Sequence, residues 1–562
     1  MSKSLYSDVR SSRANVPKHS TILRIGITAM PALLIAVVAW SVFTVGVGAR
    51  PVAGDGTLKR AEKALHEGEF SEADKLFREV LQNDGKDINA RCGLSYALLK
   101  QHKLNEAYDQ ALVAVNQDPL SARARSILGT IMLRTGDFPK AMTEFRSALS
   151  INENTALAIA GIALIDFYEN RTRESLNGLR RASFLSPDEP DFVFEMGQIA
   201  ARSEHYKEAA DSYERFLRIA PKTDSDRRDR IRGLIDFLRY LNLQGSLYVA
   251  GGEERTTVGF RSPDSRPQLD VRINGNRKPL NFVLDTGSGM SVISEETAQR
   301  LGVREIARGG QARGVGGPGR FDIVYGFVKT LEIGGVRMEN VPVYIRKFYS
   351  NNGVDGYLGL AVISKFAAVA DYKNNSFTLQ RQNGRDPAEM WQTLYRVQGA
   401  AVDSTGKETL QIPIRTTSSG FLSGEVQIDG VAGNLNFIID TGASISVVGE
   451  SLYKREDLKQ FVSRDPLRIY GAAGVTENVI ALLLPKIRLG PHQSENISAA
   501  VLDLGVVNET TGFEQMGIIG GNFLKNYRVT FDFARGYITL EPIGKRGSGA
   551  EPVRSGESPQ QT

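Results

Sequence analysis

Three patterns of hydrophobic and polar residues follow one another along the chain. Residues 25–49 contain no charged side chain, and a helix of that length spans a bilayer core of about 30 Å. Residues 54–243 carry apolar side chains at helical spacing, whereas residues 246–545 alternate in short runs between glycine-rich turns. The patterns predict a multidomain chain with an N-terminal transmembrane helix, an all-α region and then an all-β region.

The N-terminal segment, residues 1–24, holds an excess of basic side chains over its one acid, Asp8. The positive-inside tendency therefore predicts a cytoplasmic N-terminus and export of everything after residue 50. A cleaved signal peptide is the alternative, because residues 47–49 are small, although signal cores are usually shorter than this run. The basic residues are Lys3, Arg10, Arg13, Lys18 and Arg24.

The α region repeats with a fixed step. A turn-and-helix phrase begins at residues 68, 102, 136, 170 and 204, which are 34 apart, and small residues recur in phase at Ala73, Ala107, Ala141, Ser175 and Ala209. This period resembles the tetratricopeptide repeat, which implies paired helices stacked as a solenoid and a protein or peptide partner in its groove. We expect five repeats and a capping helix at 227–243, with the arginines of that helix on a solvated face and Cys92 in the core.

The β region states one phrase twice. Residues 280–288 read LNFVLDTGS and residues 435–443 read LNFIIDTGA, so Asp285 and Asp440 occupy matching frames. A carboxylate after a buried apolar run is costly unless it is hydrogen-bonded or has a task. We therefore expect two equivalent halves, 246–381 and 409–545, joined by a polar connector, 382–408, and followed by a disordered tail, 546–562.

The two halves correspond beyond this phrase. Each continues with a glycine-rich hairpin tip about 30 residues later, then an apolar-apolar-Gly motif at 357–359 or 518–520, and then a closing strand pair. In that order the motifs resemble the pepsin and retropepsin aspartic proteases, in a bilobed arrangement. The repeats and this domain together predict a bacterial protein of the inner membrane, with the bulk of the chain facing the periplasm.

The resemblance implies one catalytic dyad, Asp285 and Asp440. Two carboxyl groups that share a proton can activate water and protonate a peptide carbonyl without a metal. The supporting loop residues are Thr286, Gly287, Ser288, Thr441, Gly442 and Ala443. Because Ser288 can offer a hydroxyl to Asp285 and Ala443 cannot do so for Asp440, we expect Asp285 to be the charged partner and Asp440 to hold the proton.

Two glycine-rich tips are the predicted flaps that close over a peptide. Their residues are Gly314, Gly316, Gly317, Tyr470, Gly471 and Gly474. Tyr470 either borders the site or packs inward, and the sequence leaves both alternatives open. Residues 314–319 also match the dinucleotide fingerprint G-x-G-x-x-G, but strand-like segments rather than a helix follow them, which excludes that interpretation.

Composition excludes several other classes of function. A net charge of +5 over 562 residues and the lack of basic runs argue against nucleic acid, and one cysteine excludes internal disulfides. The five histidines show no metal-ligand spacing, so we expect neither a metal nor a cofactor.

The sequence predicts a membrane-anchored aspartic endopeptidase whose repeats bind or position a protein substrate. Two alternatives remain open at this stage. Each half could dimerise with its counterpart in another chain, or the β domain could be a non-catalytic peptide-binding scaffold.

Overall fold

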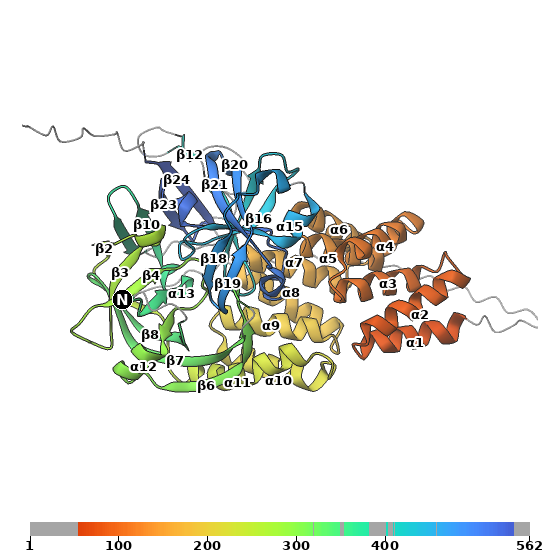
Figure 1. The fold of residues 1–562 in the computed structure, drawn as a ribbon. Coiled ribbons are helices and arrows are strands. Elements are labelled where there is room, and N and C mark those ends of the chain that lie inside the picture. The colour runs from red at the N-terminus through yellow and green to blue at the C-terminus, as the bar shows by residue number, and fades with distance from the viewer. Residues whose placement is uncertain are drawn as a thin grey trace, which may run out of the picture. The chain divides into compact units, whose positions relative to one another are not determined.

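The computed structural model describes residues 54–317, 320–348, 353–381, 401–402, 408–409, 411–456 and 458–543. The predicted transmembrane helix at 25–49, the tail at 546–562 and most of the connector lie outside these ranges. Within them, no helix combines the length and apolar character that crossing a bilayer requires. Figure 1 shows a helical N-terminal region followed by a region of strands, which confirms the predicted order of the α and β regions.

Paired helices of 13 and 14 residues make up the helical region, as the 34-residue period requires. The last helix, α11, is longer, at 18 residues. The helices are α1 (Gly54–His66), α2 (Phe70–Asn83), α3 (Ile88–Lys100), α4 (Leu104–Gln117), α5 (Ala122–Arg134), α6 (Phe138–Ile151), α7 (Ala156–Tyr168), α8 (Thr172–Leu185), α9 (Pro190–Arg202), α10 (Tyr206–Ile219) and α11 (Ser225–Asn242).

Small residues in the first helix of a pair make room for a ring from a second helix. A Cβ on Gly93 would lie 2.3 Å from the Phe77 ring, and one on Gly161 would lie 2.1 Å from the Phe145 ring. Phe77 and Phe145 are fully buried. The recurring bulky positions are therefore the core that joins neighbouring repeats.

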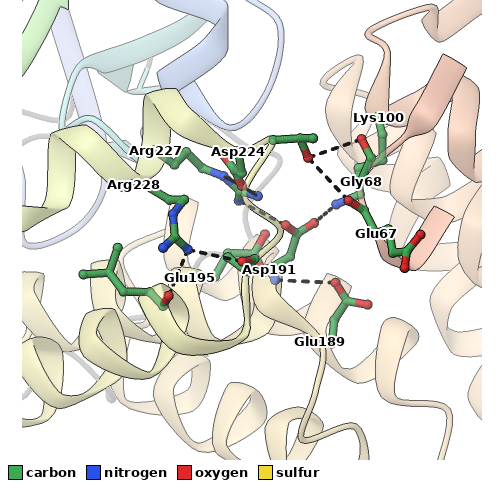
Figure 2. A network of polar contacts seen from close by, with 12 residues as sticks. Glu67, Gly68, Lys100, Glu189, Asp191, Glu195, Asp224, Arg227 and Arg228 are labelled. Carbon is green, nitrogen blue, oxygen red and sulfur yellow. Dashed lines mark hydrogen bonds and ion pairs between the residues drawn. The ribbon is translucent and has the colours of Figure 1, made fainter. Parts of the chain in front are cut away.

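Charged side chains from distant repeats meet on one side of the array (Figure 2). Asp191 of α9 forms ion pairs with Lys100 of α3 and with Arg227 of α11, the latter at 3.0 Å. Arg227 also pairs with Asp224 at 2.5 Å. The two cations outweigh the cost of burial and hold the pKa of Asp191 well below its usual range. We call Lys100, Asp191, Asp224 and Arg227 together the inner-face ion network.

The prediction that the arginines of α11 face solvent is wrong for Arg227 and Arg228, whereas Arg232 is exposed as predicted, with 65% of its side chain accessible. Arg227 has only 28% of its side chain exposed, and Arg228 donates to the carbonyls of Leu217 and Ala220 at 2.9 and 3.2 Å. Arg227 thus ties α11 to α9, and Arg228 ties it to the end of α10. The sequence pattern of α11 does not distinguish such paired arginines from solvated ones.

The first half of the β region forms an eight-stranded sheet in the order β1-β8-β5-β9-β4-β3-β7-β6. Short helices α12 (Glu295–Leu301) and α13 (Leu360–Ile363) and the turn η1 (Pro263–Ser265) complete it. Its strands are β1 (Val249–Gly252), β3 (Gln268–Ile273), β4 (Leu280–Leu284), β5 (Val292–Ser294), β6 (Glu305–Arg313), β7 (Arg320–Ile333), β8 (Val336–Arg346) and β9 (Gly356–Leu358).

The second half belongs to a twelve-stranded sheet that also takes in β2 (Arg255–Gly259), β10 (Phe366–Asp371) and β11 (Ser376–Arg381) of the first half. Its own strands are β14 (Gln411–Thr416), β15 (Leu422–Ile428), β16 (Leu435–Ile439), β17 (Ser446–Gly449), β20 (Ala481–Leu489), β21 (His492–Leu502), β22 (Gly517–Ile519), β23 (Tyr527–Asp532) and β24 (Tyr537–Pro542). Two further hairpins are β12 (Ala401–Val402) with β13 (Glu408–Thr409) and β18 (Leu467–Gly471) with β19 (Gly474–Val479). The short helices here are α15 (Glu450–Arg455), η2 (Leu458–Phe461), α16 (Gly505–Thr511) and α17 (Gly521–Leu524).

Strands from the two halves pair directly within one chain. Strand β10 of the first half runs antiparallel to β23 of the second, with Ala367 opposite Asp532 and Asp371 opposite Arg528. The ladder continues through β24 to β14 on one side and through β11 to β2 on the other. A continuous set of backbone hydrogen bonds therefore joins both halves.

The hydrophobic core of the repeats also takes in Ala307, Tyr325 and Phe513 of the β domain, whose other buried residues form clusters of their own. Phe513, which follows α16, lies 4.9 Å from the ring of Phe138 and 5.0 Å from that of Tyr168. On α11, Phe237 stacks on Tyr325 of β7 with ring centroids 4.5 Å apart. Buried aromatic pairs of this kind stabilise an interface beyond the area that they bury.

We predict that Asp191→Asn lowers the free energy of unfolding by about 3–5 kcal/mol, because it removes the carboxylate that Lys100 and Arg227 share and leaves Arg227 with Asp224 alone. Urea denaturation of the full chain, followed by helical circular dichroism, measures this change. Asp211→Asn is the matched control: it breaks an exposed pair with Lys207 and should cost about 0–1 kcal/mol. Equal losses in the two variants would contradict a structural role for the inner-face ion network.

Candidate active site

The two repeated aspartates lie at equivalent strand ends. Asp285 follows β4, and its amide donates to the carbonyl of Leu358 in the parallel strand β9 at 3.0 Å. Asp440 follows β16, and its amide donates to Ile519 of β22 at 2.9 Å. The apolar-apolar-Gly motifs of the sequence are thus the strands that fix the carboxylate-bearing loops.

Two threonines cross between the halves directly beneath the aspartates. The Thr286 hydroxyl donates to the Ile439 carbonyl, and the Thr441 hydroxyl donates to the Leu284 carbonyl, each at 2.7 Å. Each hydroxyl also accepts the other threonine's amide, at 3.0 and 3.1 Å. Both threonines are fully buried, so these four bonds hold the loops without competition from water.

The crossing threonines bring the two aspartate carboxyl groups within hydrogen-bonding reach of each other. The glycines of the motif leave room for this approach, because a Cβ on Gly287 would lie 2.4 Å from the Asp440 carboxyl and one on Gly442 2.6 Å from that of Asp285. Both residues are half-buried beside the cleft, with their carboxyl groups closely surrounded by protein atoms. Two like charges in such a place cannot both ionise cheaply, so the pair shares one proton.

Backbone amides decide which aspartate keeps the shared proton. Burial, and then the charge and hydrogen bond of Asp440, raise the pKa of Asp285 well above its ordinary value. Burial also raises the pKa of Asp440, but this rise is opposed by the amide of Gly442, at 2.7 Å, by Asp285 and by the amide of Ala443, at 3.2 Å. We therefore place the proton on Asp285 and the negative charge on Asp440.

This assignment reverses the expectation from the sequence, which placed the proton on Asp440. The hydroxyl of Ser288 does not serve Asp285; it donates to the carbonyl of Met290 at 2.9 Å. Asp285 accepts instead the amide of Gly287 at 3.0 Å. The serine at 288 thus stabilises its own turn through Met290, a bond that Ala443 cannot make. The pKa values of the two aspartates are set instead by the backbone amides of the turns.

The two predicted flaps meet at their tips. Strands β6 and β7 form one hairpin, and β18 and β19 form the other. A Cβ on Gly316 would lie 2.8 Å from Gly471, and one on Gly317 2.7 Å from the carbonyl of Ala473. Side chains at these positions would hold the tips apart, which gives the glycines of both flaps a packing role.

A cleft of about 1910 Å³ lies between the flaps and the dyad. Tyr470 of β18 lines it with 55% of the side chain exposed, so the alternative that Tyr470 packs inward is wrong. Residues of α9, α10 and α11 border the cleft as well. The helix α11 packs closely on the first flap, because a Cβ on Gly233 would lie 2.0 Å from the carbonyl of Arg308.

Sequence reasoning missed two serines that support the dyad loops. Ser291 and Ser446 are buried, and their hydroxyls accept the amides of Gly359 and Gly520, each at 3.1 Å. Their equivalent places after the two Asp-Thr-Gly motifs were the signal that could have found them. No signal in the sequence pointed to the helices that border the cleft.

The described part of the chain contains no cluster of three His, Cys, Asp or Glu side chains that could hold a metal ion.

Comparison with known families agrees with this geometry. The aspartyl protease family model matches residues 269–362 and 424–523, which are the two halves that carry Asp285 and Asp440. The tetratricopeptide repeat model matches residues 92–156 and 161–223. The chain joins tetratricopeptide repeats to an aspartyl protease-type domain.

Individual relatives resemble the repeats. Tetratricopeptide repeat protein 6 of Homo sapiens is 23% identical over 159 residues, which cover 28% of this chain and 30% of that protein. Anaphase-promoting complex subunit 3 of Schizosaccharomyces pombe is 23% identical over 160 residues, 28% of this chain and 24% of that one. The chain thus spans less than a third of either relative.

Solved structures give similar matches. A thermophilic TPR protein of Thermus thermophilus is 20% identical, covers 34% of this chain and 100% of its own, and has a TM-score of 0.29. The pilF protein of Pseudomonas aeruginosa is 15% identical, covers 34% and 93%, and has a TM-score of 0.25.

We predict that Thr441→Val destabilises the aspartyl protease-type domain, because the Leu284 carbonyl and the Thr286 amide both lose a buried partner. Each unpaired group costs about 1–3 kcal/mol. Chemical denaturation of the full chain, followed by the fluorescence of its aromatic side chains, measures the loss. Thr441→Ser keeps the hydroxyl and should retain most of the stability; a loss as large as that of Thr441→Val would contradict the view that the hydroxyl alone holds the two loops together.

Proposed function

We propose that the protein is an aspartic endopeptidase that hydrolyses peptide bonds with the dyad Asp285 and Asp440 of a single chain. The observation that carries this proposal is the pair of closely placed carboxyl groups that line a cleft of about 1910 Å³. A shared proton between two carboxyl groups is the feature on which aspartic proteases in general depend.

The asymmetry of the dyad assigns a role to each member. Asp440, the charged partner, accepts a proton from a water molecule held between the carboxyl groups. Asp285, the protonated partner, donates its proton to the oxygen of the scissile carbonyl as the water attacks. The flaps exclude bulk water, which strengthens both interactions.

The internal ladder of β10 and β23 supports one dyad per chain rather than two dyads shared between chains. The crossed threonines support the same conclusion, because their four hydrogen bonds already link the two Asp-Thr-Gly loops of one chain. The alternative of a non-catalytic scaffold has no comparable support, since a peptide-binding groove does not need two buried carboxyl groups that oppose each other.

We also propose that the chain is anchored in a membrane by residues 25–49 and acts on the exported side. The uncharged run and the basic residues before it support this topology. The repeats would bind or position a protein substrate or partner for the protease-type domain. A bacterial inner membrane, with the catalytic bulk in the periplasm, fits the combination.

We predict that the full chain cleaves peptides of a mixed library and that Asp285→Asn abolishes cleavage, because one carboxyl group can no longer exchange its proton. Mass spectrometry of the library after incubation at several pH values detects the products. Pepstatin-type inhibition is the second control. Absence of cleavage at every pH would overturn the proposed function, and products that persist in Asp285→Asn would exclude this dyad.

The dyad should work only in its singly protonated form. Acidification protonates Asp440, and alkalinisation removes the proton of Asp285, whose pKa lies well above the ordinary 3.8; activity should therefore extend towards neutral pH. We predict that Ser288→Ala leaves both limbs of the pH–rate profile in place, since its hydroxyl bonds Met290. A shift of either limb would show that the Ser288 hydroxyl does hydrogen-bond Asp285 and influence its pKa.

A further inference from the structure

The cleft has a wall that does not come from either half of the protease-type domain. Its lining includes Arg202, the last residue of α9, beside the loop that joins β14 to β15. The same loop contains Ser419, whose carbonyl lies close to Gly289. A Cβ added to Gly289 would lie only 2.7 Å from that carbonyl oxygen. Gly289 follows the first Asp-Thr-Gly-Ser motif, so the wall continues directly into the dyad loop.

Arg202 is held in this wall by neutral groups. Its Nη2 donates to the carbonyl of Thr417 and, at 3.2 Å, to that of Ser418. The guanidinium carbon lies 3.8 Å from the centre of the Phe167 ring. These contacts hold the guanidinium group between the loop and the Phe167 ring through Nη2 and the ring face, and the second terminal nitrogen takes no part in them.

That second nitrogen, Nη1, is buried and has no hydrogen-bond partner among the described residues. Arg202 forms no ion pair with a carboxylate of the described chain either, and burial lowers the pKa of the guanidinium to about 10. A buried cationic N–H without an acceptor is costly. A carboxylate that enters the cleft would supply the missing acceptor after a small turn of the guanidinium group.

The rest of the cleft lining also favours a negatively charged ligand. Arginines outnumber acidic side chains among its described lining residues once the dyad is set aside. Arg266, on the side of the first half, has 16% of its side chain exposed and a buried Nε without a partner. Its carboxylate neighbour, Asp264, is 4.0 Å away and largely exposed. The cleft is therefore suited to a ligand that brings negative charge.

We propose that Arg202 is a specificity-determining residue, contributed by the repeats, that binds the carboxylate of an acidic side chain in an extended substrate peptide. This inference rests on the proposed function and deepens it by naming a substrate class. The same chemistry would also accept the terminal carboxylate of a short peptide, and the experiment separates the two sources. It also gives the fusion of the domains a direct purpose, because one domain completes the substrate site of the other.

A purely structural role for Arg202 makes a different prediction. If its hydrogen bonds only held the loop at residues 417–418, removal of the side chain would slow the cleavage of every peptide to the same extent. If Arg202 binds a substrate carboxylate, removal would slow only the cleavage of peptides that carry the carboxylate at one fixed distance from the scissile bond.

The test compares cleavage of a peptide library by the full chain and by Arg202→Met, with products identified by mass spectrometry. We expect Asp or Glu to be enriched at one position relative to the cleaved bond in the wild type. For a defined substrate, Glu→Gln at that position should lower kcat/KM about tenfold or more in the wild type and leave it unchanged in Arg202→Met. Arg202→Lys should retain part of the preference.

Two controls complete the test. Arg146→Met removes an exposed arginine of α6 that does not line the cleft, and it should leave the preference intact. A C-terminally amidated library should keep the enrichment if a side chain is the ligand; loss of the enrichment on amidation would instead assign the carboxylate to the end of the peptide and overturn the side-chain proposal. No enrichment, an enrichment that survives Arg202→Met, or an equal loss for all peptides would also overturn it.

A binding measurement keeps this proposal separate from the proposed function. Fluorescence anisotropy with the Asp440→Asn chain compares a fluorescein-labelled peptide rich in Glu with its Gln counterpart. Tighter binding of the Glu peptide that disappears in Asp440→Asn/Arg202→Met would support the carboxylate site even if the wild type cleaves nothing. Equal binding of both peptides would reject it.

Discussion

Four hydrogen bonds between Thr286 and Thr441 and the strands beneath them are the constraint on which the site depends. Each threonine reaches across to the backbone of the other half, so neither Asp-Thr-Gly loop is complete alone. The consequence is that two carboxyl groups, which repel each other when both are charged, are held in contact. Their shared proton, and the chemistry proposed from it, follow from this crossing.

Contacts elsewhere in the fold also hold the two halves, and the repeats beside them, in place. The ladder of β10 and β23 joins the halves through backbone bonds that no side-chain change removes directly. On the other side, α11 packs on β6, and Phe513 enters the aromatic cluster of Phe138 and Tyr168. A few buried side chains of the β domain therefore pack into the hydrophobic core of the repeats that border its cleft. Binding of a partner to the repeats would act on the flap and the cleft wall through these contacts.

The sequence predicted the features that depend on local pattern. The 34-residue period identified the repeats, and the doubled Asp-Thr-Gly motif pointed to both aspartates. Each of these patterns depends only on residues that are close together in the sequence. The features it missed depend on packing between distant segments. Ser288 could have faced Asp285 or Met290, and Arg227 could have faced solvent or Asp191; only the tertiary structure decides between such alternatives. Arg202 carries no local signal at all, since its role depends on a loop more than two hundred residues later.

The most direct test of the central claim mixes two inactive chains. If one chain holds the whole dyad, Asp285→Asn and Asp440→Asn should each fail to cleave a peptide that the wild type cleaves, and their equimolar mixture should fail as well. Recovery of activity in the mixture would show that aspartates from different chains form the dyad. Undiminished activity of either variant alone would show that the two carboxyl groups are not the catalytic pair.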